Sequence, residues 1–311
     1  MASSSACSST TTTQSSISHA ERNFLLQGIR DNCRVDGRSW TEWRRTTVTT
    51  GVLPLSHGSA RCGSCLCSVK AELNSSTGRS VIRVHVDQQP WPLVQECLEL
   101  ALGPSLSLGE SAAWVLQIDV STHVTTHTTS KQQQQQQPYV SPTIVHQCIR
   151  YALADTVLPQ VSVLEPEEGA VHQDTTTAAA RVHLEDGEGE RLVPSVDTIP
   201  YVITIHIVDH QFAILDATRE ESLLSSTLSS SSSSSSSSTP CRVHVAVLHS
   251  DNKNVDSQIL GVSTTGVLPL AMMDQCIPLA MQAVPSLNEA FRVNKNKGGL
   301  RCFLPHVVQL E

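Results

Sequence analysis

The chain has 311 residues, of which 39% are hydrophobic and 16% charged, and its formal net charge is −8. This length allows one large or two small domains, and no apolar run approaches the roughly 20 residues that a membrane-spanning helix needs. Eight acidic residues and one arginine between positions 165 and 190 carry most of the negative charge. The rest of the chain is nearly neutral, which argues against a surface that binds nucleic acid unaided.

Serine and threonine dominate residues 1–18, which contain no charged side chain. The segment lacks the basic start and apolar centre of a secretory signal, and it lacks the arginines of a transit peptide. We therefore expect an intracellular protein. Its ten cysteines are then expected to be reduced thiols rather than a disulfide framework.

Apolar periodicity predicts the regular elements, which begin with a helix over residues 19–32. Alternation with a period of two predicts half-buried strands at 67–73, 82–86, 116–120, 201–207 and 242–247, with a short strand at 213–215. Apolar stripes predict helices at 93–102, 144–153 and 272–284. Pro278 should kink the last helix or split it in two. Runs of strands that helices can cover on one side indicate an α+β, or mixed α/β, fold.

Polar, low-complexity segments interrupt this pattern, among them a glutamine run at 132–137 and a serine run at 229–238. Such segments cannot bury enough apolar area to offset the entropy of the chain. We predict a disordered N-terminus at 1–18, one domain at 19–292 and a C-terminal tail at 293–311. Loop insertions within the domain are predicted at 121–142, 165–191 and 222–240.

Cysteine and histidine residues offer two possible metal-binding patterns. Cys62 and Cys65 have the spacing of half a zinc site. A second pair at comparable spacing is missing, and Cys67 lies on the apolar face of its strand, so we favour structural cysteines over a metal site. His123 and His127 lie in a threonine-rich stretch and are predicted to be in a solvated loop. The histidines on polar strand faces are predicted to lie at a surface or interface: His85, His206 and His244.

Three carboxylates, Asp216, Glu220 and Glu221, follow the short strand at 213–215. Acids just past a strand end can hold a catalytic metal, although a capped turn is the simpler interpretation. The sequence contains no G-x-S-x-G elbow, no P-loop and no G-x-G-x-x-G motif.

Several segments resemble a known family. Residues 24–38 (FLLQGIRDNCRVDGR) resemble the opening signature of RNase PH-type exosome subunits, and residues 58–61 with 68–73 are similar to that family's first hairpin. Residues 159–165 (PQVSVLE), 200–204 (PYVIT) and 215–221 (LDATREE) resemble the second, non-catalytic class of ring subunit. That class includes the eukaryotic ribosomal RNA-processing subunit 42. The resemblance spans residues 21–292 apart from the polar insertions.

This resemblance implies an RNase PH-like domain whose core is like domain 2 of ribosomal protein S5. It also implies partners: paralogous subunits that pair into a six-membered ring, cap subunits, and RNA reached through the assembled complex, without membrane attachment or a cofactor. Arg61 is then the candidate for RNA contact. The expected location is the nucleus, nucleolus and cytoplasm.

Active members of the family carry an arginine pair, a phosphate-binding loop and aspartates. Residues 89–93 (QPWPL) correspond to the arginine pair of active members, and residues 137–142 (QPYVSP) correspond to their phosphate-binding loop. Neither stretch contains a lysine or an arginine. Asp216 matches one acid position, which inactive members keep in degenerate form. Because phosphorolysis needs cations around the attacking phosphate, we expect no catalytic or metal-binding residues and a structural role in RNA processing, including ribosomal RNA maturation. The alternatives are an active phosphate-dependent 3'–5' exoribonuclease and an adaptor that has left the complex.

Overall fold

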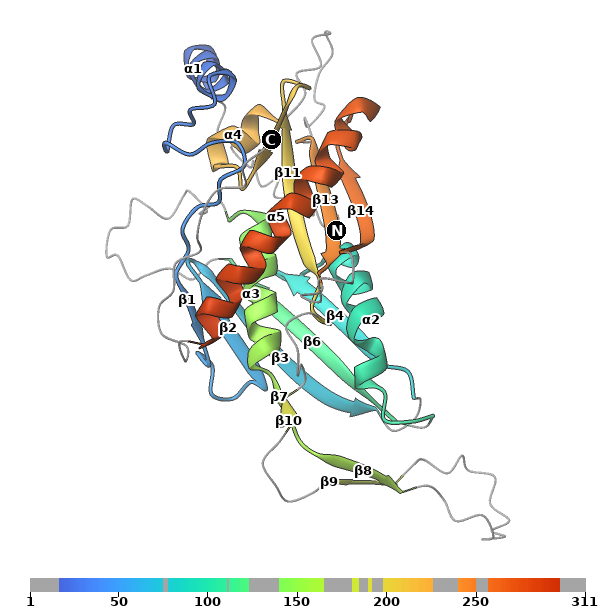
Figure 1. Ribbon diagram of the computed structural model, residues 1–311. Coiled ribbons are helices and arrows are strands. Elements are labelled where there is room, and N and C mark those ends of the chain that lie inside the picture. Colours follow the sequence, from blue (N-terminus) through green and yellow to red (C-terminus); the bar gives the residue numbers. More distant parts are fainter. Residues whose placement is uncertain are drawn as a thin grey trace, which may run out of the picture.

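The computed structural model of the chain describes residues 17–74, 78–110, 112–122, 140–164, 181–184, 190–191, 198–225, 240–249 and 257–296. These residues form a six-stranded and a four-stranded sheet with helices packed on them, together with two small ribbons (Figure 1). This arrangement confirms the predicted mixed α/β class. The predictions for residues 1–16 and for both homopolymeric runs concern segments outside the described residues.

The six-stranded sheet has the order β1-β2-β3-β6-β4-β5. Its strands are β1 (Val48–Thr50), β2 (Gly58–Cys62), β3 (Cys65–Asn74), β4 (Val81–Val86), β5 (Gln89–Pro90) and β6 (Ala113–Ser121). Neighbouring strands are antiparallel except β4 and β6, which run parallel. Alternation places Val69, Val84 and Ile118 in the core, while Ser68, His85 and Asp119 share the opposite face.

Helices α2 (Pro92–Leu106) and α3 (Pro142–Asp155) cover the apolar face of this sheet. Gly58 marks a close approach of α3 to β2, because a Cβ atom at this position would lie 2.5 Å from the carbonyl oxygen of Ala152 and 2.7 Å from Cα of Thr156. A glycine at this position therefore lets the end of α3 lie directly on strand β2. Cys148 of α3 points into the same core, where its Sγ lies 3.3 Å from the carbonyl oxygen of Ala60.

The four-stranded sheet has the order β12-β11-β13-β14, formed by Phe212–Leu215, Tyr201–Val208, Arg242–Leu248 and Gln258–Thr265. All eight residues of β11 are buried because both of its faces are covered. Helix α5 (Leu270–Asn296) packs on one face, and α3 contacts the other. At its far end α5 reaches α3, where Phe291 stacks on Tyr151 with ring centroids 4.5 Å apart.

Helix α5 corrects two predictions. It continues unbroken through Pro278 and Pro285, so of the two outcomes predicted at Pro278, a kink or a split, the split is wrong. The helix also extends to Asn296, into the predicted tail at 293–311. Both prolines are exposed, on the face opposite the buried stripe that contains Cys276 and Ala280. The carbonyl groups that lose a helical donor there can be hydrated, which lowers the cost of each proline.

Short elements occupy parts of the predicted loops. β7 (Val157–Leu158) pairs with β10 (Glu190–Arg191), and β8 (Val161–Leu164) pairs with β9 (Arg181–Leu184). Strands β9 and β10 lie inside the predicted loop at 165–191, which the prediction missed because the segment is short and flanked by acidic residues.

Helices α1 (His19–Arg30) and α4 (Arg219–Leu224) lie together at one end of the four-stranded sheet (Figure 1). The last turn of α4 corrects the prediction of a loop from residue 222. Its start is defined by a capping box, in which Thr218 and Glu221 each bind the other's backbone N–H.

Candidate functional site

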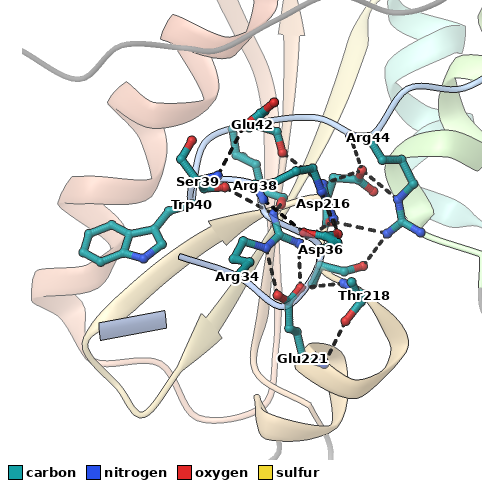
Figure 2. A network of polar contacts seen from close by, with 12 residues as sticks. Arg34, Asp36, Arg38, Ser39, Trp40, Glu42, Arg44, Asp216, Thr218 and Glu221 are labelled. Carbon is teal, nitrogen blue, oxygen red and sulfur yellow. Dashed lines mark hydrogen bonds and ion pairs between the residues drawn. The ribbon is translucent and has the colours of Figure 1, made fainter. Parts of the chain in front are cut away.

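The segment after α1 turns back on itself and presents two arginines to the rest of the domain. Gly37 has φ +80°, a conformation that suits glycine. The N–H of Gly37 donates to the carbonyl oxygen of Arg34 (2.8 Å), and the N–H of Arg34 donates to the carbonyl oxygen of Arg38 (3.1 Å). This turn directs the guanidinium groups of Arg34 and Arg38 toward the β12–α4 connection (Figure 2).

Arg34 forms a buried, two-pronged ion pair with Glu221. Its Nε and Nη2 lie 2.8 and 2.6 Å from the two carboxylate oxygens, and both side chains are almost fully buried. Arg34 also donates to the carbonyl oxygens of Leu215 and Asp216 at 3.1 and 3.0 Å. One guanidinium therefore joins the end of β12 to the first turn of α4, a geometry for which arginine is better suited than lysine.

Asp216 is surrounded by arginine donors (Figure 2). Its Oδ2 accepts hydrogen bonds from Arg38 Nη1 at 3.1 Å and from Arg44 Nε and the Arg44 backbone N–H, both at 2.9 Å. Its Oδ1 is buried and has no hydrogen-bond partner, and the residue has φ 46°. Neither carboxylate oxygen therefore faces open solvent.

Opposite charges pair within this network. Arg34, Arg38 and Arg44 face Asp216, Glu221 and Asp36, and Asp36 accepts a bond from Arg38 Nε at 2.8 Å. Burial alone would raise the pKa of Asp36, but the hydrogen bond and positive charge of Arg38 lower it overall. The network is a structural clamp between the N-terminal segment and the β12–α4 connection.

The three acidic side chains that follow β12, Asp216, Glu220 and Glu221, do not point toward a common site. Asp216 and Glu221 are engaged by different arginines, while Glu220 is exposed. Among the described residues, no group of three or more His, Cys, Asp or Glu side chains could hold a metal ion. The capped turn, which was the simpler interpretation, is the arrangement found.

Arg61 lies in β2 of the six-stranded sheet, whereas Asp216 follows β12 of the other sheet. The Nε of Arg61 donates to the carbonyl oxygen of Gly63 at 3.2 Å, within the β2–β3 hairpin. Its strand partner, Leu66, lines a cavity of about 860 Å³ on the outer face of the sheet. Asp87 and Asp119 also line this cavity, and such carboxylates repel phosphate. RNA contact by Arg61 stays a prediction.

The places that the resemblance assigns to cationic motifs lie partly within the described residues. Gln89 and Pro90 form the exposed strand β5, and Pro92 begins α2. At the phosphate-loop place residues 137–139 lie outside the described part of the chain, and Ser141 is the buried N-cap of α3, without a side-chain capping bond.

Three histidines are buried in or beside the four-stranded sheet: His146 belongs to α3, which packs on that sheet, whereas His206 and His244 belong to β11 and β13. This corrects the surface alternative predicted for His206 and His244. The Nδ1 of His146 accepts from the N–H of Val202, and His244 Nδ1 lies 2.9 Å from Thr204 Oγ1. Burial lowers the pKa of His146 to about 3 and that of His244 to about 4, with Arg150 and Arg242 respectively adding to the effect. Burial, together with nearby arginines, also lowers the pKa of His206 well below its usual range. All three are neutral at pH 7.

His85, the third histidine predicted on a polar face, is half-buried, and its Nδ1 lies 3.5 Å from Asp119. His123 and His127 lie outside the described residues. The eight cysteines in the described part are free thiols, and all but Cys33 are buried.

Within the part of the chain that the structure describes, no helix has the length and hydropathy that crossing a membrane requires.

Comparisons with known proteins identify the fold. No family model matches the sequence. A chain of an archaeal exosome core superposes with a TM-score of 0.53 at 15% identity, covering 87% of this chain and 96% of the other. A chain of the Archaeoglobus fulgidus exosome with RNA bound to the active site superposes with a TM-score of 0.51 at 15% identity, covering 87% and 97%. Rice (Oryza sativa) Rrp46 is also 15% identical, covering 85% and 100%, but its TM-score of 0.46 gives it no weight.

The chain thus has the RNase PH-like fold of exosome core subunits, as the sequence predicted. At 15% identity the likeness concerns the fold alone. Whether the chain is catalytic depends on the chemistry of its own residues.

Proposed function

We propose that this chain is a non-catalytic subunit of an exosome-type ring that holds RNA-degrading partners in place. The observation that carries the proposal is the state of Asp216. This residue occupies the acid position of the family, yet Arg38 and Arg44 donate three hydrogen bonds to its Oδ2, and its Oδ1 is buried. A carboxylate neutralised in this way is not available to bind a metal or to accept a proton from substrate.

The sequence at the cationic positions supports the same proposal. Phosphorolysis brings a phosphate ion next to a phosphodiester, and the combined negative charge must be stabilised by cations or N–H donors. Residues 89–93 and 137–142 contain no arginine or lysine. Each stretch contains two prolines, which have no N–H to donate.

Strand β14 supports assembly into a ring. It lies at an edge of the four-stranded sheet, is eight residues long and contains no charged side chain, and Ile259 and Val262 are partly exposed. The described edge strands β1, β5 and β12 have only three, two and four residues. A long, uncharged edge is a template for pairing with another chain, so a partner strand is its natural cover.

The finer parts of the proposal follow from the family resemblance. They are support of ribosomal RNA maturation, contact with paralogous ring and cap subunits, RNA binding through the assembled complex, and action in the nucleus, nucleolus and cytoplasm.

Assembly is tested by expressing the full chain alone and together with paralogous ring subunits, followed by size-exclusion chromatography with light scattering. We expect poor solubility alone and a stable heteromer on co-expression. Val262→Lys should weaken the heteromer by placing a charge on the β14 edge. The matched control is Leu55→Lys, on a loop of the other sheet where the side chain is 97% exposed. A soluble monomer that binds no paralogue would overturn the proposal.

Catalysis is tested separately by incubating the purified chain with single-stranded RNA and inorganic phosphate. We expect no nucleoside diphosphate above a protein-free blank. Phosphate-dependent release that is lost in a folded Asp216→Asn variant would instead establish the alternative, an active 3'–5' exoribonuclease.

A further inference from the structure

A cavity of about 430 Å³ lies between the N-terminal part of α5, the start of β12 and the segment after α1. Its volume falls in the range of pockets that hold small ligands or single side chains. The lining residues share one property, which is that none carries a positive charge: Trp40, Gln211, Ala213, Asp274, Gln275, Pro278, Leu279 and Gln282. The cavity plays no part in the Asp216 network or in the β14 edge.

The apolar wall of this cavity is held rigidly. The Trp40 indole N–H donates to the carbonyl oxygen of Ile29 at 2.5 Å, and the ring packs edge-on against Phe212 with centroids 5.3 Å apart. Leu279 is buried beneath the rim. An indole fixed by both contacts can accept a flat group against its ring without losing much further freedom.

The polar rim is a set of hydrogen-bond acceptors on α5. Asp274, Pro278 and Gln282 follow one another at intervals of four residues, and all three are exposed. Because Pro278 has no N–H, it cannot donate to the carbonyl oxygen of Asp274 as an ordinary helical residue would. Asp274, which lines the cavity, therefore has a carboxylate and a main-chain carbonyl oxygen that receives no N–H from residue 278.

We propose that this cavity binds an arginine side chain presented by a protein partner. A guanidinium group is planar and positively charged, and it can stack on the Trp40 indole while its N–H groups donate to Asp274. An acidic or phosphate-bearing group would find no cation among the lining residues. This inference does not depend on the proposed ring function.

The probe is the full chain, in complex if it is soluble only that way, titrated with the peptide acetyl-Gly-Gly-Arg-Gly-Gly-amide. The readout is the ¹H–¹⁵N indole resonance of Trp40, assigned from its loss in Trp40→Phe. We expect a millimolar Kd. A peptide with citrulline, which has nearly the shape of arginine but no charge, should bind at least about tenfold more weakly.

The decisive variants keep the shape of α5. Asp274→Asn should weaken arginine-peptide binding about five- to tenfold, consistent with the loss of one charge-assisted hydrogen bond. Glu289→Gln, which removes an exposed acid of α5 outside the cavity, should change it less than about twofold. Equal binding of the citrulline peptide, no effect of Asp274→Asn, no indole shift at 20 mM peptide, or a larger shift with an RNA oligonucleotide would each overturn the proposal.

Discussion

Lowering the pH from 7.5 to 5.5 should destabilise the folded chain strongly through His146, His206 and His244. A histidine in the unfolded chain titrates near pH 6.5, whereas the pKa values of these three in the folded chain lie well below that. As the pH falls through 6.5, the three histidines become protonated in the unfolded chain but stay neutral in the folded chain. The stabilisation is therefore present above pH 6.5 and is lost below it.

The size of the loss follows from this difference in proton uptake. Each histidine protonated only in the unfolded state favours unfolding by about 1.4 kcal/mol between pH 7.5 and 5.5, so three contribute about 4 kcal/mol. The result does not depend on how far each pKa is lowered, provided that it stays well below 5.5. Against a typical total stability of about 5–15 kcal/mol, this loss is large.

Urea unfolding followed by circular dichroism at the two pH values measures the difference. In His244→Gln the pH-dependent loss should shrink by about 1.4 kcal/mol, whatever the variant does to absolute stability. The matched control, His19→Gln, changes an exposed histidine at the start of α1. A loss below about 1 kcal/mol in the unmodified chain, or an identical pH slope in His244→Gln, would refute the argument that these side chains are buried and neutral.

Three further predictions concern the clamp, a close contact and the surface charge. Arg34→Met should lower the free energy of unfolding in urea by about 3–5 kcal/mol because it leaves the buried Glu221 carboxylate unpaired. Arg34→Met/Glu221→Leu should recover much of that loss, and a single variant of nearly unchanged stability would contradict this. Gly58→Ala should lower Tm or prevent folding because its Cβ would lie 2.5 Å from the Ala152 carbonyl oxygen, whereas Gly103→Ala, with its nearest contact at 3.3 Å, should be tolerated; equal effects would argue against that packing. The isolated chain should bind single-stranded RNA only weakly near 150 mM salt because its body is nearly neutral, and submicromolar binding in a filter assay would contradict it.

Periodicity predicted the helices α1, α2, α3 and α5 and most of the long strands, because their apolar positions repeat over at least two turns or several strand residues. It missed β14, whose residues do not alternate between apolar and polar, and the short helix α4. The stripe containing Cys148 and Ile149 predicted α3, and the alternation of Ile203 and Ile205 predicted β11. β9 escaped prediction because four residues are too few for a repeat to stand out from acidic neighbours. Helix α5 is longer than predicted because Pro278 and Pro285 face solvent, where the helix tolerates them, and the sequence pattern does not show this exposure.

Side-chain burial on the second face of a strand was harder to predict. Alternation correctly separated His206 and His244 from the isoleucines and valines beside α5, but it could not reveal that α3 covers the opposite face. That contact joins Thr143 to the N–H of Thr204, 61 positions away. A polar face of a strand is solvent-exposed only when nothing packs on it, and this depends on tertiary structure.

The role of Asp216 depends on the same kind of distant contact. The sequence places an acid after a short strand, where it could hold a metal or cap a turn, and both uses need the same residue type. The outcome is decided by Arg38 and Arg44, which lie 178 and 172 positions away and reach Oδ2 only because the turn at Gly37 folds the N-terminal segment onto the β12–α4 connection. Acids at a strand end therefore support a catalytic role only when the groups that bind them are known. Here the positive charges that bind Asp216 are arginines of the chain itself.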